Sequence, residues 1–155
     1  MDIRYASLIF DNIPTGIFTI DESLSISSFN RAAERITGWS QSEVCGRPCN
    51  EIFRSNHCAE MCFLKDSIKA GGQHHDREVK SRRRDGSQLL VSISTAALRD
   101  DSGRVIGGVE MMRDLTAIDT LRRELTSSYT SDDIISKSAA MRDVRDLLPL
   151  VARSE

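Results

Sequence analysis

Three β-prone segments in the second half of the chain constrain its fold more than any other feature. They span about residues 75–82, 88–98 and 105–113. The short polar stretches Asp85-Gly86 and Asp101-Ser102-Gly103 separate them, and turns of this kind join neighbouring antiparallel strands. The pattern therefore predicts an antiparallel meander, which needs an apolar layer packed over one face.

The first half of the chain predicts two more strands and several short helices. Apolar residues spaced by three and four predict an amphipathic helix over residues 3–12. Strands are expected over residues 17–20 and 24–29, where apolar and polar residues alternate. Asn30 is a suitable N-cap for a helix over residues 31–37. Together the two halves predict one five-stranded antiparallel sheet with helices over one face.

Two further helices are predicted later in the chain. One covers about residues 59–70 and ends at Gly71-Gly72. The other follows Asp114, which is its expected cap, and has a narrow apolar stripe typical of a coiled-coil seam. The stripe consists of Leu115, Ile118, Leu121 and Leu125.

Composition and charge exclude several classes of protein. The 155 residues suffice for one domain with a core, and the formal net charge of −2 gives no bulk attraction to nucleic acid or to an anionic membrane. No apolar run approaches the roughly 20 residues that span a bilayer, and no signal peptide is visible. We expect a cytoplasmic protein with no membrane contact and no direct nucleic acid contact in this chain.

Several motifs, taken in their order along the chain, resemble those of the PAS sensor family. They are Asp11–Phe18, Phe29–Glu34, Thr37–Trp39, Arg84–Ser87, Gly107–Glu110 and Asp114–Thr116. The last motif is similar to the Asp-aliphatic-Thr signature that joins the final PAS strand to an output helix. The resemblance covers about residues 8–125. It implies an α+β PAS fold: a five-stranded antiparallel sheet with short helices on one face, an N-terminal helix and a C-terminal signalling helix.

The end of the chain resembles the opening of the AAA+ module of sigma-54-dependent transcription activators. The matching segments are Asp133–Met141, Leu147–Pro149 and Val151-Ala152. The chain contains no Gly-x-x-x-x-Gly-Lys-Ser/Thr loop, so we expect no ATPase and no other enzyme activity in this chain. ATP binding, DNA binding and contact with sigma-54 RNA polymerase are what the resemblance implies for the full-length protein. The alternative for this tail is a generic amphipathic helix.

These resemblances divide the chain into four parts. They are an N-terminal helix at residues 1–12, a PAS sensor domain at 13–114, a signalling helix and linker at 115–130, and the start of a truncated AAA+ module at 131–155. A signalling helix with an apolar seam needs a partner helix. We therefore expect a homodimer that uses the N-terminal helix and the seam residues.

All four cysteines lie in one short window and are the main candidates for a functional site. They are Cys45, Cys49, Cys58 and Cys62. Cys58 and Cys62 are four residues apart and would share one face of the predicted helix. Four thiolates that meet at one point suit tetrahedral zinc or an iron–sulfur cluster.

Sigma-54 activators with a PAS sensor resemble this chain in the cysteine window, in a pattern that needs three cysteines. The resemblance implies a site of Cys49, Cys58 and Cys62, with either Cys45 or His57 as the fourth ligand. Two alternatives to a metal or cluster remain open. One is reversible thiol–disulfide sensing through a Cys49–Cys58 or Cys58–Cys62 bond, and the other is a set of buried, inert cysteines.

Other cofactors are weaker candidates. The segment Gly46–Cys49 resembles the photoactive-cysteine motif of flavin-binding PAS domains, but Asn50–Phe53 departs from that family, so we do not expect flavin. Haem would need a well-placed histidine, and His74 and His75 are expected to be exposed at the start of a strand. We therefore predict a signal-sensing regulatory domain that acts through cysteine chemistry; the alternative is a ligand-free PAS platform for dimerisation and interaction.

Overall fold

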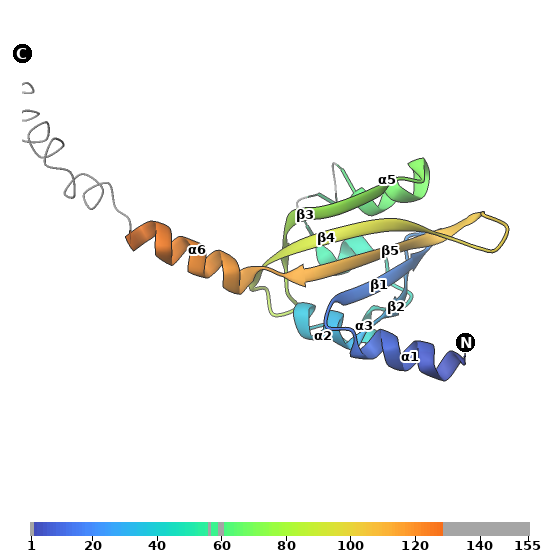
Figure 1. Ribbon diagram of the computed structural model, residues 1–155, viewed down its shortest axis with the longest axis horizontal. Coiled ribbons are helices and arrows are strands. Elements are labelled where there is room, and N and C mark those ends of the chain that lie inside the picture. Colours follow the sequence, from blue (N-terminus) through green and yellow to red (C-terminus); the bar gives the residue numbers. More distant parts are fainter. Residues whose placement is uncertain (1, 56, 59–60, 129–155) are drawn as a thin grey trace, which may run out of the picture. The chain divides into compact units, whose positions relative to one another are not determined.

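The computed structural model describes residues 2–55, 57–58 and 61–128, and the chain divides into two units at Thr116 (Figure 1). The strands are β1 (Gly16–Asp21), β2 (Ile26–Phe29), β3 (Gln73–Arg82), β4 (Gln88–Arg99) and β5 (Val105–Asp114). The helices are α1 (Ile3–Asn12), α2 (Arg31–Thr37), α3 (Gln41–Val44), α4 (Cys49–Phe53), α5 (Phe63–Ala70) and α6 (Thr116–Ser128). No helix among the described residues is long and apolar enough to cross a membrane.

The five strands form one antiparallel sheet in the order β2-β1-β5-β4-β3. The last strand, β5, lies in the centre and pairs with β1 on one side and with β4 on the other. This confirms the predicted sheet, including the three-stranded meander of β3, β4 and β5. The predicted N-terminal helix and the helix that follows β5 are present as well.

The hydrophobic core lies between the sheet and the helices that pack against it. In Figure 1, α2 and α5 lie against the sheet, and α2 contacts β1 while α5 contacts β4 and β5. Every second residue of β4 from Leu89 to Thr95 is buried, because side chains of a strand alternate between the two faces of a sheet. The largest apolar side chains of this core are Phe18, Phe29, Ile20, Ile26, Leu89 and Met112.

Asn30 connects three elements around the start of α2. Its side-chain oxygen accepts hydrogen bonds from the backbone N–H of Ala33 and of Ile17, both at 2.9 Å. Its amide nitrogen donates to the carbonyls of Phe10 and Thr15, each at 3.0 Å. The predicted N-cap is therefore confirmed. The same fully buried side chain also ties α2 to the end of α1 and to the start of β1.

Two predicted boundaries were wrong. The second strand begins at Ile26 rather than Leu24, because Leu24 has a positive φ of 66° and belongs to the preceding turn. Helix α5 begins at Phe63, and Cys62 is its N-cap, with an extended backbone (φ −78°, ψ 106°) and a sulfur that accepts from the N–H of Lys65. Cys58 and Cys62 therefore do not share one face of a helix.

The junction after β5 is held by side-chain hydrogen bonds. Arg83 Nη2 donates to Asp114 Oδ2 at 2.7 Å, and Asp114 Oδ1 accepts from the N–H of Thr116 at 2.8 Å. A second guanidinium nitrogen of Arg83 donates to the carbonyl of Ile36 at the end of α2. The motif Asp114–Thr116, which predicted the connection from the last strand to an output helix, is thus linked to the hairpin between β3 and β4.

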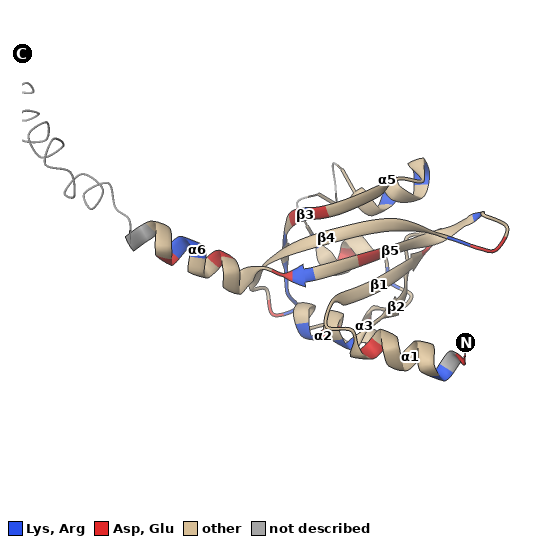
Figure 2. Cartoon of the chain, viewed as in Figure 1, with Lys and Arg blue, Asp and Glu red and all other residues tan. Residues whose placement is uncertain are grey.

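Residues 117–128 of helix α6 form the described part of the second unit. Three residues of the predicted apolar stripe, Ile118, Leu121 and Leu125, are 48%, 59% and 62% exposed, and Leu115 precedes the helix. Acidic and basic residues are interspersed along β3, β5 and α6, as Figure 2 shows. The predicted final helix around residues 141–151 lies outside the described residues.

Candidate ligand cavity

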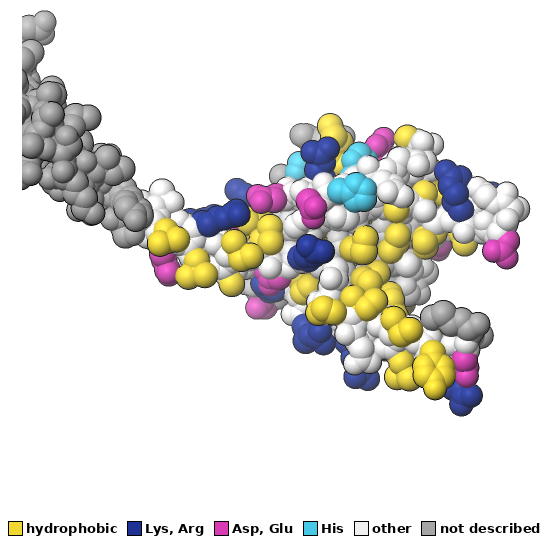
Figure 3. Space-filling model, in the orientation of Figure 1, with side chains coloured by type: hydrophobic (Ala, Val, Ile, Leu, Met, Phe, Trp, Pro, Cys, Tyr) yellow, Lys and Arg dark blue, Asp and Glu magenta, His cyan; other side chains and the backbone are white. Residues whose placement is uncertain are grey.

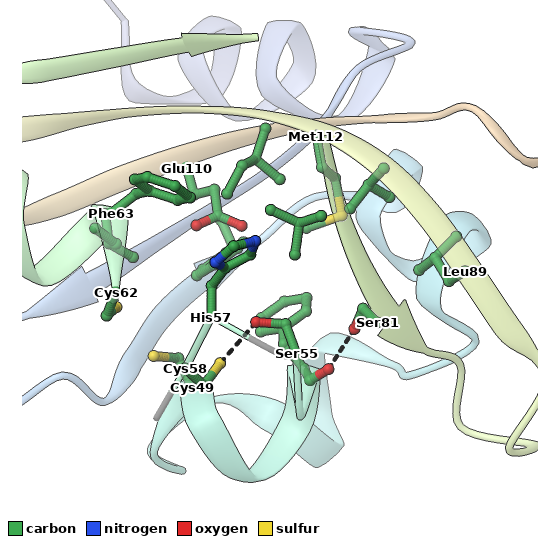
Figure 4. A pocket seen from close by; sticks show the side chains of 16 residues that line it. Cys49, Ser55, His57, Cys58, Cys62, Phe63, Ser81, Leu89, Glu110 and Met112 are labelled. Atoms are coloured by element: carbon green, nitrogen blue, oxygen red, sulfur yellow. Dashed lines mark hydrogen bonds between the residues drawn. The ribbon is translucent and has the colours of Figure 1, made fainter. Parts of the chain in front are cut away.

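A small cavity of about 50 Å³ lies between α4, α5 and the inner face of the sheet (Figure 4). Because about 10–15 Å³ suffices for one water molecule, the cavity has room for a small ligand. Its apolar wall consists of Phe18, Phe53, Phe63, Leu64, Val79, Leu89, Val91, Ile93 and Met112. Its remaining lining residues are Cys49, Ser55, His57, Cys58, Cys62, Ser81 and Glu110.

Three of the four cysteines line this cavity. Cys49 is the first residue of α4, Cys58 lies in the connection after it, and Cys62 caps α5. Cys45 is exposed and is not among the lining residues. The structure therefore groups the cysteines of the three-cysteine pattern and leaves Cys45 outside. All four are free thiols.

The thiol of Cys49 is held in its neutral form. Burial, and to a smaller extent the neighbouring acidic groups of Cys62, Glu110 and Cys58, raises its pKa to about 12. Because the thiolate is the nucleophile, the raised pKa makes Cys49 a weaker nucleophile near neutral pH than an ordinary cysteine. The acidic groups of the cavity thus act on one another although they come from distant parts of the sequence.

Cys58 and Cys62 have weaker local partners. The sulfur of Cys58 shares a hydrogen bond with Ser55 Oγ at 3.1 Å, and the sulfur of Cys62 accepts from the N–H of Lys65 at 3.5 Å. His57 also lines the cavity, and its ring packs against Phe63 with centroids 5.3 Å apart. In Figure 4, Cys58 and Ser55 lie close to α4, whereas Cys62 lies beside Phe63 at the start of α5.

Glu110 is the residue of this site that the sequence analysis did not single out. It lies on β5, opposite Phe18 of β1 and Thr95 of β4, and its side chain points toward the cavity in Figure 4. Burial raises the pKa of this carboxyl group to about 8. No hydrogen bond or ion pair with another described residue reaches it. The available signal was strand alternation, which puts Glu110 on the same face as the buried Met112.

The donor atoms are of the kind that binds zinc or an iron–sulfur cluster, but they do not form a finished site. Within residues 2–55, 57–58 and 61–128, no three His, Cys, Asp or Glu side chains lie close enough together to hold a metal ion. Thiolates, imidazole and carboxylate all bind zinc, and thiolates bind iron–sulfur clusters. The residues thus fit such a centre by chemistry, and the sulfur atoms would have to approach one another.

The remaining candidate residues take structural positions. His75 is exposed, as predicted, but His74 is half-buried: its Nε2 lies 2.8 Å from Asp66 Oδ2 and its ring packs on Phe63. Trp39 packs against the core, and the guanidinium groups of Arg47 and Arg84 lie over its ring at 5.6 and 5.4 Å.

The fold and the motifs together define the class of protein. The PAS fold family matches residues 5–115, so this chain belongs to the PAS family. A crystal structure of a PAS domain from Colwellia psychrerythraea has the same fold, with a TM-score of 0.62 and 17% sequence identity. That match covers 74% of this chain and 98% of the other.

The similar curated proteins include two signal-transduction proteins. The chain is 27% identical over 121 residues to the signal transduction histidine-protein kinase AtoS of Escherichia coli, which covers 78% of this chain and 19% of that protein. It is 22% identical over 154 residues to the signal-transduction and transcriptional-control protein of Clostridium beijerinckii, covering 97% of this chain and 23% of that protein. The chain thus spans about a fifth of the length of either relative and is a signal-sensing PAS domain of a regulatory protein.

Proposed function

We propose that this chain is the sensory domain of a sigma-54-dependent transcription activator and works in the cytoplasm. Two observations support the proposal. Residues 131–155 resemble the opening of the AAA+ module of such activators, and the similarity to the Clostridium beijerinckii transcriptional-control protein extends over 97% of the chain, beyond the PAS fold itself. ATP hydrolysis and contact with RNA polymerase belong to the full-length protein, and this chain is a regulator without catalysis of its own.

The sensing site is the cavity that contains Cys49, Cys58 and Cys62. The observation that carries this assignment is that all three line one cavity beside β5, whose last residue, Asp114, holds the junction to α6. A change at the cysteines acts on the central strand of the sheet and on the junction at its end. The expected output is a change in the population of two arrangements of α6, which frees or restrains the ATPase.

The chemistry at the cysteines is a bound metal ion, an iron–sulfur cluster or reversible oxidation of the thiols. If a cluster is bound, its destruction by oxygen or nitric oxide is the signal. If the thiols are the switch, a Cys58–Cys62 or Cys49–Cys58 disulfide has the same effect. A cytosolic location keeps the thiols reduced until the signal arrives.

Elemental analysis of protein purified without oxygen tests the site. We expect zinc, or iron with inorganic sulfide, in the wild type and in Cys45→Ser, and its loss in Cys58→Ser. If the site is a redox switch, mild oxidation should instead remove two free thiols in the wild type and in Cys45→Ser. In Cys58→Ser it should remove none, because both proposed disulfides contain Cys58. Metal-free protein whose thiols also resist oxidation would refute the cysteine site.

The second candidate function is a PAS platform for dimerisation without a ligand. An exposed apolar surface on α1 favours it: Tyr5, Leu8 and Ile9 are 66%, 59% and 52% exposed. Figure 3 shows hydrophobic side chains over α1 and over the neighbouring strands. The exposed seam of α6 is a second surface of this kind.

Light scattering tests the homodimer, which both candidate functions use. We expect a dimer for the wild type and a shift to monomer for Leu8→Glu or Leu121→Glu, with Ser7→Glu as a surface control. A monomer at high concentration, both for this chain and for one that includes the ATPase, would rule the homodimer out. A dimer with no metal and no oxidisable thiol would favour the platform over the sensor.

A further inference from the structure

Most of the ionisable groups that line the cavity are acids, and the imidazole of His57 is the exception. Four of them are acids, namely the thiols of Cys49, Cys58 and Cys62 and the carboxyl group of Glu110. Among the described residues that line the cavity, none is Lys or Arg. Acids brought together in an apolar space resist ionisation, and a bound cation removes that cost. The cavity therefore suits a cation better than an anion.

Glu110 is the best fixed of these acids. Its strand is central, and backbone pairing holds it on both sides, to Phe18 in β1 and to Thr95 in β4. The carboxyl group borders the cavity and has no hydrogen-bond or ion-pair partner among the described residues. Glu110 is half-buried, and a carboxyl group that faces a cavity without such a partner is available to bind a ligand.

The other candidates for a fourth donor fit less well. Cys45 is exposed and lies outside the cavity, at the C-terminal end of α3. His57 reaches the cavity, but its ring already packs on Phe63. Glu110 has neither disadvantage.

We propose that Glu110 is the fourth donor, with Cys49, Cys58 and Cys62, of a centre that binds a thiophilic cation. This inference rests on the proposed cysteine site and changes its membership: a carboxylate on the central strand takes the place of Cys45. The shared chemistry is three thiolates and one carboxylate oxygen. Zinc accepts that set as a single ion, and an iron–sulfur cluster takes thiolates and can accept a different ligand at one iron.

The four proposed donors come from different parts of the fold. Cys49 and Glu110 lie in α4 and β5, whereas the described residues between α4 and α5, including Cys58, lie outside helices and strands. Among the described residues no three of these side chains are close enough to hold an ion, so binding would have to draw the thiols toward the carboxylate. Because Glu110 is four residues before Asp114, a ligand on it acts on the strand that leads directly to the output junction.

Zinc affinity measured by chelator competition, on protein reduced and handled without oxygen, tests the assignment. The variants are Glu110→Gln, His57→Gln and Cys45→Ser, with the exposed Glu22→Gln as the matched control for a lost carboxylate. We expect Glu110→Gln to bind zinc at least about tenfold more weakly, and Cys45→Ser and Glu22→Gln to stay within about twofold of the wild type. Glu110→Gln is nearly isosteric, and circular dichroism checks that it stays folded.

Cobalt provides an independent readout of the donors. In Glu110→Gln, the ligand-field bands of bound Co²⁺ should shift while the thiolate-to-cobalt bands remain. Iron and sulfide analysis of wild type and Glu110→Gln, both purified without oxygen, distinguishes a cluster from a single ion. In either case the variant should hold less of the native centre.

The outcomes separate this inference from the proposed function. Glu110 is not the fourth donor if Cys58→Ser abolishes zinc binding while Glu110→Gln leaves it unchanged. The same conclusion follows if His57→Gln or Cys45→Ser weakens zinc binding more than Glu110→Gln does. In both cases the cysteine site stands. If the wild type binds neither zinc nor a cluster, the assignment of Glu110 falls with the metal site. The thiol oxidation assay then decides whether the cysteines still sense.

Discussion

Two carboxyl groups on β5 lie four residues apart and have opposite surroundings. Burial acts to raise the pKa of Asp114, but hydrogen bonds from Thr116 and Arg83 outweigh it, so that this pKa is lowered overall. Glu110 has no such donors, and burial raises its pKa to about 8. The partnered acid stabilises the end of the strand. The unpartnered acid costs stability when it ionises, because no donor offsets the desolvation of its charged form.

The largest expected effect is a stability difference that depends on pH at Glu110. Its folded pKa lies above its ordinary value of 4.5, so the folded state holds the proton more tightly than the unfolded state. The free energy of unfolding therefore falls as pH rises from about 4.5 to about 8, and then levels off. In metal-free protein, Glu110→Gln should be more stable than the wild type at pH 8.5 by about 1–3 kcal/mol, and nearly equal to it at pH 4.5.

Urea unfolding of both proteins in the presence of a chelator, across this pH range, measures the difference. The exposed Glu22→Gln should show no such pH-dependent gain. Equal stabilities of Glu110→Gln and the wild type at pH 8.5 would mean that Glu110 already has a partner, and the contrast with Asp114 would disappear.

Removal of Arg83 should give the next largest effect. Arg83→Met deprives Asp114 of its ion pair and the carbonyl of Ile36 of a donor. Because both charged side chains remain partly exposed, we expect a loss of about 1–2 kcal/mol in the free energy of unfolding. Thermal and urea unfolding test this at pH 7. The exposed neighbour Arg82→Met, which loses one hydrogen bond to Gly86, is the control and should cost less.

Asp114→Asn should have a smaller effect of opposite sign to that of Glu110→Gln. The lowered pKa of Asp114 means that its charge stabilises the folded protein at neutral pH, and this contribution is lost as pH falls below the ordinary value of 3.8. The variant should therefore be less stable than the wild type at pH 7 by about 1 kcal/mol, with the difference shrinking in acid. A stabilising Asp114→Asn would show that the two acids do not differ as described.

The smallest expected effect on stability is that of a substitution at Cys45. The comparison here is between the exposed thiol of Cys45 and the more buried thiol of Cys49. Cys45→Ser should change the free energy of unfolding by less than about 0.5 kcal/mol, because Cys45 is exposed. In the wild type at pH 7.5, mass spectrometry should find Cys45 alkylated first and Cys49 last, since burial raises the pKa of Cys49 to about 12. Rapid alkylation of Cys49 in folded protein would contradict the buried arrangement.

Local sequence rules were sufficient for most of the secondary structure. The turns at Asp85-Gly86 and after Asp101 separate β3, β4 and β5 as predicted, and Asn30 caps α2. These features depend on neighbours in sequence, such as an N-cap side chain bonded to an N–H three residues later. The start of α5 was predicted too early because Cys62 takes the cap position, a role that cysteine propensities do not predict.

The sequence by itself determined the strand and helix order, the cysteine window and the resemblance to PAS sensors. Only the tertiary structure decided that Cys49, Cys58 and Cys62 face one cavity, that Cys45 does not, and that Glu110 joins them. The physical reason is that periodicity assigns a side chain to a face of a strand or helix, but not to a neighbour across the core. Glu110 meets the cysteines because β5 is the centre of the sheet, and its position there comes from pairing with β1, almost a hundred residues away in the sequence.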